Sequence, residues 1–159
     1  MGEKSYCNCC LTLYKISKIF VLIYGEQYKS MNKFIALIGA GYWGKNLLRN
    51  LYELEVLHTA CEVNKEIIDE RKKKFFDVYY TTSYQEVLAN DQIKAVVIAT
   101  PAATHFEKVK QALLADKDVF VEKPLALKVE EGEKLVKLAR ERNRILMVGH
   151  NFTVSSSSN

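Results

Sequence analysis

A glycine-rich turn between an apolar run and a helix-like segment constrains this chain more than any other feature. Residues 34–38 are all apolar and lead into Gly39-Ala-Gly41-Tyr-Trp-Gly44, after which apolar residues recur at helical spacing. A Gly-x-Gly-x-x-Gly turn between a strand and a helix predicts a site for the pyrophosphate of a dinucleotide. We expect Gly39 to make the tight bend, Gly41 to let the backbone approach the ligand, and Gly44 to let the helix pack close to the strand. The alternative is a glycine turn that binds nothing.

The rest of the chain alternates between strand-like and helix-like segments. The expected strands cover about 33–38, 55–62, 78–80, 94–99, 118–121 and 145–148. The expected helices cover about 42–53, 65–75, 84–89, 104–115 and 129–142. The segment 94–99 is rich in β-branched and apolar residues, which is typical of a strand buried on both faces. Six strands alternating with helices predict an α/β fold of the Rossmann type, a doubly wound parallel sheet with helices on both faces.

Several helix starts carry capping signals. Asn64 precedes one expected helix, and Ser83 with Glu86 and Thr104 with Glu107 match the capping-box pattern at two others. In the last expected helix, one face is predicted to be buried. That face contains Val129, Leu135, Leu138 and Ala139.

The residues just after the expected strands are candidate ligand contacts, because the carboxyl ends of parallel strands meet at one edge of a sheet. Glu62 follows the second strand, where an acid would accept hydrogen bonds from an adenosine ribose and repel a 2′-phosphate. The sequence therefore favours NAD over NADP, with an ordinary exposed acid as the alternative interpretation of Glu62. Later strand ends contribute Thr100-Pro101, Glu122-Lys123-Pro124 and Gly149-His150-Asn151.

Four motifs occur in a fixed order along these strand ends. They are Gly39-Ala-Gly-Tyr-Trp-Gly44, Ala99-Thr-Pro-Ala-Ala-Thr-His105, Val121-Glu-Lys-Pro-Leu-Ala126 and Val148-Gly-His-Asn151. Together they resemble the N-terminal domain of the glucose–fructose oxidoreductase / inositol dehydrogenase family over nearly all of residues 33–151. The resemblance implies hydride transfer between NAD(P) and a sugar or related cyclic alcohol. The sequence of residues 41–50 is similar to that of family members that act on nucleotide-linked sugars.

By this resemblance Lys123 is the catalytic lysine, which reaches the sugar hydroxyl and the nicotinamide ribose. The alternative is a surface lysine before a proline, and the sequence leaves the isomer of the Lys123–Pro124 bond open. Packing or capping explains His105 as well as a ligand contact does, and the chain departs from the family pattern after Asn151. The residues expected at the cofactor are Gly39, Gly41, Tyr42, Trp43, Gly44, Glu62, Thr100, Pro101, His105, Glu122 and Asn151.

Residues 31–152 are expected to form the dinucleotide-binding domain, with segments outside the fold on both sides. Residues 1–30 are expected to be a disordered extension, and the Ser-rich residues 153–159 a disordered tail. Three amino-terminal cysteines lack the second ligand pair that zinc needs, so no metal is expected. The apolar run among the first 30 residues is too short to span a membrane, and no secretory signal is evident. These observations favour the cytoplasm.

Charge and cysteine usage limit the partners. The chain has 23 Lys and Arg against 19 Asp and Glu, a net charge of +4, but the basic residues are scattered among acids. No basic stripe interleaved with aromatic residues is present, so nucleic acid is not an expected partner. Cys61 falls in an expected strand and is predicted to be a core residue. The dinucleotide is the expected partner, and a homo-oligomer is left open.

Family members continue with a second domain that forms the floor of the substrate pocket and supplies a catalytic histidine. No such domain is expected in the few residues after 151. We therefore expect an NAD(P)-binding domain that is incomplete for catalysis alone and meets a sugar or nucleotide sugar only when completed by a second domain. The alternatives are a non-catalytic nucleotide-binding module and a degenerate fragment that folds poorly. A methyltransferase would leave Glu122-Lys123-Pro124 unexplained.

Overall fold

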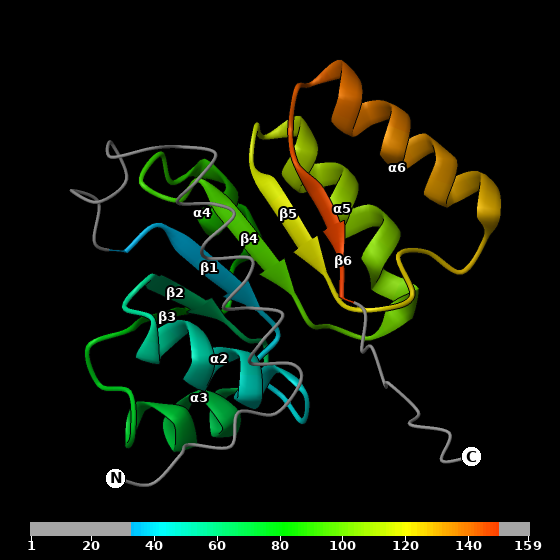
Figure 1. The fold of residues 1–159 in the computed structure, drawn as a ribbon. Helices are drawn as coiled ribbons and strands as arrows, with labels where there is room; N and C mark the ends of the chain where they lie inside the picture. Colours follow the sequence, from blue (N-terminus) through cyan, green and yellow to red (C-terminus); the bar gives the residue numbers. More distant parts are fainter. Residues whose placement is uncertain (1–32, 150–159) are drawn as a thin grey trace, which may run out of the picture.

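The structure, a computed structural model, describes residues 33–149 (Figure 1). Within this range six strands form one parallel sheet in the order β3-β2-β1-β4-β5-β6. The predicted Rossmann-type fold is confirmed. The predictions for residues 1–30, for Asn151 and for the tail 153–159 lie outside the described residues.

The element bounds agree closely with those expected. The strands are β1 (Ile35–Ile38), β2 (Leu57–Cys61), β3 (Tyr79–Thr81), β4 (Ala95–Ile98), β5 (Asp118–Val121) and β6 (Leu146–Val148). The helices are α2 (Gly44–Glu53), α3 (Lys65–Lys72), α4 (Tyr84–Ala89), α5 (His105–Leu114) and α6 (Val129–Glu141), with a 3-10 turn at Ala102–Thr104. The strand order reverses between β1 and β4, so the ends of these strands flank the crevice where ligands bind in such sheets.

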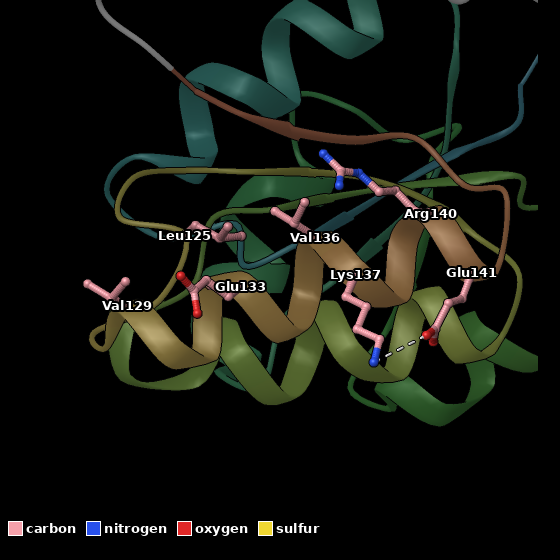
Figure 2. Close-up of a pocket in the computed structure, with 8 residues that line it drawn as sticks. Leu125, Val129, Glu133, Val136, Lys137, Arg140 and Glu141 are labelled. Carbon is pink, nitrogen blue, oxygen red and sulfur yellow. Dashed lines mark ion pairs between the residues drawn. The ribbon is translucent and has the colours of Figure 1, made fainter.

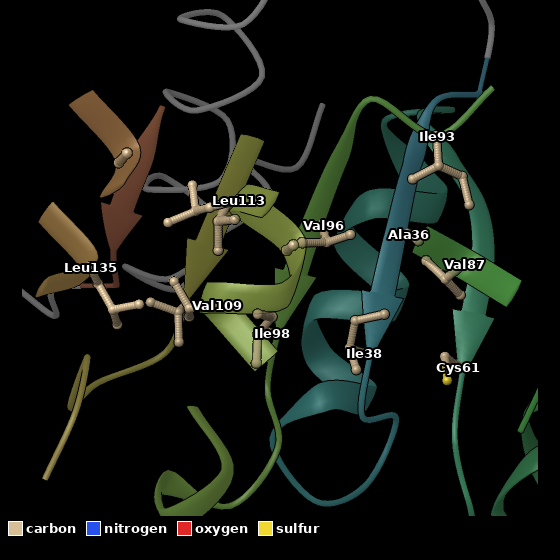
Figure 3. Packing of buried hydrophobic residues seen from close by; sticks show 14 residues of the cluster. Ala36, Ile38, Cys61, Val87, Ile93, Val96, Ile98, Val109, Leu113 and Leu135 are labelled. Carbon is tan, nitrogen blue, oxygen red and sulfur yellow. The ribbon is translucent and has the colours of Figure 1, made fainter. Parts of the chain in front are cut away.

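The side chains of β1 divide the core into two clusters. Ile35 and Leu37 pack on one face with residues of α2 such as Leu47, whereas Ala36 and Ile38 pack on the other face with residues of α4, α5 and α6. Figure 3 shows the second cluster, in which side chains from the sheet and from the helices meet. Every residue of β1 and β4 is buried, which confirms a strand covered on both faces at 94–99.

Two of the predicted helix caps have opposite outcomes. The Asn64 side chain accepts hydrogen bonds from the N–H groups of Glu66 and Ile67 at 2.9 and 3.4 Å, as predicted. The capping box at Thr104 is wrong, because α5 begins without a side-chain cap. The Thr104 hydroxyl instead donates backwards to Pro101 O at 2.8 Å.

Only one of the two hydrogen bonds of the predicted capping box at Ser83 forms. Ser83 Oγ accepts from Glu86 N at 3.2 Å, but the Glu86 carboxylate does not return to Ser83 N. It accepts from the hydroxyls of Thr81 and Tyr79, and these hydrogen bonds hold the pKa of Glu86 below its ordinary value. The acid therefore joins α4 to β3.

The buried face of α6 is narrower than the sequence indicates. Leu135 and Ala139 are buried and Leu138 is partly buried, but Val129 is 75% exposed, so its predicted burial is wrong. Cys61 is buried in the core as predicted, and this burial raises the pKa of its thiol to about 11. No helix among residues 33–149 combines the length and apolarity needed to cross a bilayer.

Candidate functional site

The three glycines of the loop after β1 meet three different surroundings. Gly39 has φ +91°, and a Cβ there would lie 2.9 Å from Ala99 O, so the bend requires glycine. A Cβ on Gly44 would lie 1.9 Å from Gly39 O, so glycine is what lets α2 pack against the loop. A Cβ on Gly41 would meet nothing within 4 Å. Gly39 and Gly44 are needed for the turn itself, whereas Gly41 leaves its backbone accessible to a ligand.

The amino terminus of α2 begins at this open backbone. Its cap residue, Trp43, forms no side-chain capping hydrogen bond, and the first turn contains no acid, so α2 itself does not compensate its positive end. Tyr42 and Trp43 are exposed, and their rings meet edge to face with centroids 6.1 Å apart. Lys45 Nζ lies 5.0 Å from the centre of the Tyr42 ring. A helix start of this kind is suited to an anion, and the two aromatic side chains lie next to it.

Glu62, at the end of β2, holds the glycine loop in place. Its Oε2 accepts from Ala40 N at 2.8 Å and its Oε1 accepts from Asn64 N at 3.1 Å. Arg71 of α3 donates from Nε to Ala40 O at 3.3 Å, so both polar groups of Ala40 are bound by charged side chains. Glu62 is only 9% exposed. Because an ionised carboxylate has about four acceptor positions, each oxygen keeps capacity for a ligand hydroxyl.

The loop after β4 is closed by two threonines. Thr104 Oγ1 donates to Pro101 O, and Thr100 Oγ1 lies 2.7 Å from Thr104 Oγ1. Since a hydroxyl has one proton and Thr104 uses its own for Pro101, Thr100 is the donor within the pair. The half-buried Thr100 hydroxyl can therefore only accept from a ligand, while Pro101 is exposed beside it.

Glu122 and Lys123 leave β5 in different directions. Glu122 is half-buried, and a Cβ added to Gly149 would lie 3.1 Å from Glu122 Oε2, so this carboxylate lies against the end of β6. Lys123 is exposed, and its ammonium forms no hydrogen bond or ion pair with residues of the described range. The Lys123–Pro124 peptide bond is cis. Lys123 is thus available to a ligand.

His105 lies beneath these loops. Its side chain is 1% exposed, with Nδ1 2.7 Å from Pro124 O and Nε2 2.8 Å from Thr100 O. Both ring nitrogens therefore face the chain's own backbone. Of the two interpretations of His105, the geometry favours packing over contact with a ligand.

A groove runs along α6, and none of its lining residues is among the predicted site residues. Its lining combines the apolar side chains of Leu125, Val129 and Val136 with charged residues at the rim. Figure 2 shows this arrangement, with Lys137 and Glu141 paired at 3.8 Å. Residues 33–149 contain no group of three or more histidine, cysteine or acidic side chains that could hold a metal ion.

The segment that contains the glycine loop and these strand ends matches a known family. Residues 33–150 match the model of an oxidoreductase family described by its NAD-binding Rossmann fold. The chain belongs to this family. It is the glucose–fructose oxidoreductase / inositol dehydrogenase family that the motifs resemble, and the described residues form its nicotinamide-dinucleotide-binding domain.

Individual relatives agree with this assignment. An uncharacterized oxidoreductase of Synechocystis is 35% identical over 72% of this chain and 31% of its own length. A scyllo-inositol 2-dehydrogenase (NADP⁺) of Bacillus subtilis is 27% identical over 74% of this chain and 33% of its own length. The crystal structure of GenD2 from gentamicin A biosynthesis, in complex with NAD, superposes with a TM-score of 0.71 at 32% identity, covering 76% of this chain and 35% of GenD2. The chain spans about a third of the length of these relatives.

The structure brings most of the predicted residues to one edge of this oxidoreductase domain, and it adds one that sequence reasoning missed. Arg71 contacts the glycine loop from 31 residues away. No local pattern marks it, because it stands directly before Lys72-Lys73-Lys74, a run that indicates a solvated helix end. Asn151 lies outside the described residues.

Proposed function

We propose that this domain binds NAD(H) across the glycine loop and serves an oxidoreductase that moves hydride between the nicotinamide and a sugar or nucleotide-linked sugar. The observation that carries the proposal is the open space above Gly41, next to the amino terminus of α2 and to the Ala40 peptide that Glu62 holds. Close approach to the backbone and a positive helix end are what a pyrophosphate requires. Membership of the oxidoreductase family supports the same ligand.

Glu62 favours NAD(H) over NADP(H) in this proposal. The N–H groups of Ala40 and Asn64 fix its carboxylate, so it cannot swing away from a bound cofactor. A fixed negative charge repels a 2′-phosphate, whereas its remaining acceptor positions suit a ribose diol. Relatives include both a protein crystallised with NAD and one named for NADP, so the preference is argued from this chain's own residue.

Lys123 is the residue that we assign to the reacting centre. An exposed ammonium that no described side chain engages can donate to a substrate hydroxyl or to the nicotinamide ribose, and can polarise the reacting C–O bond. The neighbouring strand ends add Thr100, which offers an acceptor, and Pro101 and Glu122, which we place beside the nicotinamide. Asn151 remains a proposed contact. The nicotinamide, when bound, supplies the hydride acceptor or donor.

The second candidate function is that of a non-catalytic nucleotide-binding module. The surroundings of the two described histidines favour this function for the chain when it acts without a further domain. His105 faces two backbone carbonyls, and the ring nitrogens of His58 lie 2.7 Å from Thr59 Oγ1 and 3.1 Å from Gln92 Oε1. Neither is placed to take the proton that leaves an alcohol during hydride transfer. A positioned base contributes about 10²–10⁴-fold to such a reaction. Turnover is therefore proposed for this domain joined to the remainder that its longer relatives carry.

Titration with NADH tests the cofactor assignment. The sequence contains one tryptophan, Trp43 in the glycine loop, so energy transfer from it to the nicotinamide reports binding. We expect saturable binding to the wild type, weakening by about a hundredfold or more in Gly41→Val, because the valine side chain fills the space that the pyrophosphate needs. Lys128→Ala removes an exposed lysine that is not assigned to the site, so it is the control and should retain its affinity within about twofold.

Two results would contradict the proposal. One is the absence of saturable binding to the wild type at millimolar NADH, and the other is equal binding by Gly41→Val. Thermal melting of each variant separates lost binding from lost folding. Tighter binding of NADPH than of NADH would overturn only the role given to Glu62 and would leave the rest of the proposal standing.

A further inference from the structure

The segment that carries Lys123 is held by few contacts. Within the described part of the chain, residues 123–127 make one hydrogen bond, between Pro124 O and His105 Nδ1 at 2.7 Å. Leu125 adds a partly buried apolar contact with the core. At the far end of the segment, Lys128 begins α6 without a side-chain cap. The position of Lys123 therefore depends strongly on His105.

His105 joins this segment to a second loop. Its other nitrogen, Nε2, lies 2.8 Å from Thr100 O in the loop after β4. The ring is almost completely buried, so water does not compete for either contact. His105 is also the first residue of α5, whose side chains Val109 and Leu113 are fully buried. A helix fixed in the core thus carries the ring that touches both loops.

The chemistry of the two contacts requires the ring to be the donor. Carbonyl oxygens only accept hydrogen bonds, so an N–H of the imidazole must face Pro124 O or Thr100 O. A neutral imidazole donates to one of them, and an imidazolium donates to both. In either form the ring sets the spacing between the loops after β4 and β5.

We propose that His105 is a positioning residue that fixes the Lys123-Pro124 segment against the Thr100 loop, so that Lys123 meets the nicotinamide half of the cofactor. The part of this inference that concerns the cofactor rests on the proposed function. The connection between the two loops is a property of the protein without ligand. The two parts can be measured separately.

Amide hydrogen exchange tests the connection in the absence of cofactor. His105→Phe keeps an aromatic ring and removes both donors. We expect the Glu122 amide, which donates to Ile98 O at 2.9 Å where the segment leaves β5, to exchange about tenfold faster while the other amides of β4 and β5 keep their protection, because only a local tie is lost. His58→Phe makes the same substitution at the other described histidine and should leave this segment unchanged. Equal exchange in His105→Phe and the wild type would overturn the connection.

Acetylation of Lys123, followed by mass spectrometry of its peptide, tests the positioning. Saturating NADH should slow this acetylation severalfold in the wild type, whereas ADP should not, because ADP lacks the nicotinamide half. His105→Phe should lose the protection by NADH while its affinity for ADP stays nearly unchanged. A merely structural loss would weaken ADP and NADH binding together, and that result would contradict the proposal.

Substitution of His105 by asparagine or by glutamine distinguishes its contact with Pro124 O from its contact with Thr100 O. The Nδ2 of His105→Asn stands near the place of Nδ1 and can donate to Pro124 O, whereas the Nε2 of His105→Gln stands near that of Nε2 and can donate to Thr100 O. We expect His105→Asn to restore NADH protection of Lys123 and His105→Gln to restore it less. Loss of protection in a folded His105→Asn would overturn the assignment to Pro124. If NADH fails to protect Lys123 in the wild type, the proposed function of Lys123 fails, and hydrogen exchange still decides the connection.

Discussion

Gly44 stands where α2 starts against the turn at Gly39, and the space that a side chain would need there is already filled. A Cβ would lie 1.9 Å from Gly39 O, a backbone atom that cannot move without reshaping the turn. At Gly41, three residues earlier, a Cβ would meet nothing within 4 Å. Glycine is therefore needed at position 44 for folding, whereas at position 41 we assign it to ligand binding.

We expect Gly44→Ala to lower the free energy of unfolding by about 1–3 kcal/mol, the usual cost of overpacking. Gly41→Ala is the matched control and should change stability by less than about 0.5 kcal/mol, because its methyl group meets nothing. Urea denaturation of both variants measures the difference. Equal stabilities would show that the loop relaxes around Gly44 at no cost.

Glu62 is predicted to contact a ligand, and the structure gives it a second role within the protein. The sequence indicates an acceptor for a ribose, because an acid follows the second strand. The carboxylate also accepts from Ala40 N and Asn64 N, and so fixes the loop above which a pyrophosphate would lie. Position along the chain could predict the first role, but only the folded contact reveals the second.

At the scale of elements, α6 has the weakest start. Lys128 occupies its cap position in an extended conformation and makes no side-chain hydrogen bond. Glu130 and Glu131 in the first turn complement the helix dipole but do not satisfy its first N–H groups as a cap does. Because Glu131 stands three residues after Lys128, a serine at 128 would complete a capping box.

We expect Lys128→Ser to stabilise the domain by about 1 kcal/mol, or about 2–8 °C in melting temperature for a domain of this size. Lys128→Ala removes the same charge without supplying a cap, and it should not reproduce the gain. Differential scanning calorimetry of the two variants measures this. A gain of equal size in both would mean that the lysine charge, rather than the missing cap, weakens the start of α6.

The elements were predictable because their signals are local, whereas the contacts between loops were not. Apolar periodicity and β-branched runs predict the six strands and the five α-helices of the described residues. The capping-box spacing predicts that Thr104 caps α5, but its hydroxyl donates to Pro101 O instead. The spacing rule does not take such a competing acceptor into account. The contact of His105 with Pro124 spans 19 residues, and its geometry depends on how β4 and β5 align. Pairings of that kind become visible only in the folded chain.

At the scale of the whole molecule, the edge that gathers the site residues is also rich in exposed apolar side chains. Tyr42 and Trp43 extend from the glycine loop, Val63 follows β2, and Leu127 and Val129 follow β5. Relatives are about three times as long as the region that matches them. We infer that this edge is where the remainder of a longer protein of this family completes the site.

We therefore expect the 159-residue chain to bind NADH without measurable turnover of sugars or inositols. No histidine of the described residues is free to act as a base, which removes about 10²–10⁴-fold of rate. The assay follows NADH formation from NAD⁺ with a panel of sugars and inositols, and the scyllo-inositol 2-dehydrogenase (NADP⁺) of Bacillus subtilis, supplied with NADP⁺, is the positive control. Turnover by the chain that is abolished in Lys123→Ala would contradict this expectation.

The order of strands in the sheet has a consequence for synthesis on the ribosome. β1 emerges first among the described elements and meets β2 soon afterwards, but its other neighbour, β4, emerges only after α2, β2, α3, β3 and α4. Pairings between distant parts of a chain form late. Until Ala95 pairs with Ile35, the nascent glycine loop is supported on one side only, and Ala36 and Ile38 lack much of their cluster. Cofactor cannot stabilise the domain during this interval, so the first half of the chain must avoid aggregation without help from its ligand.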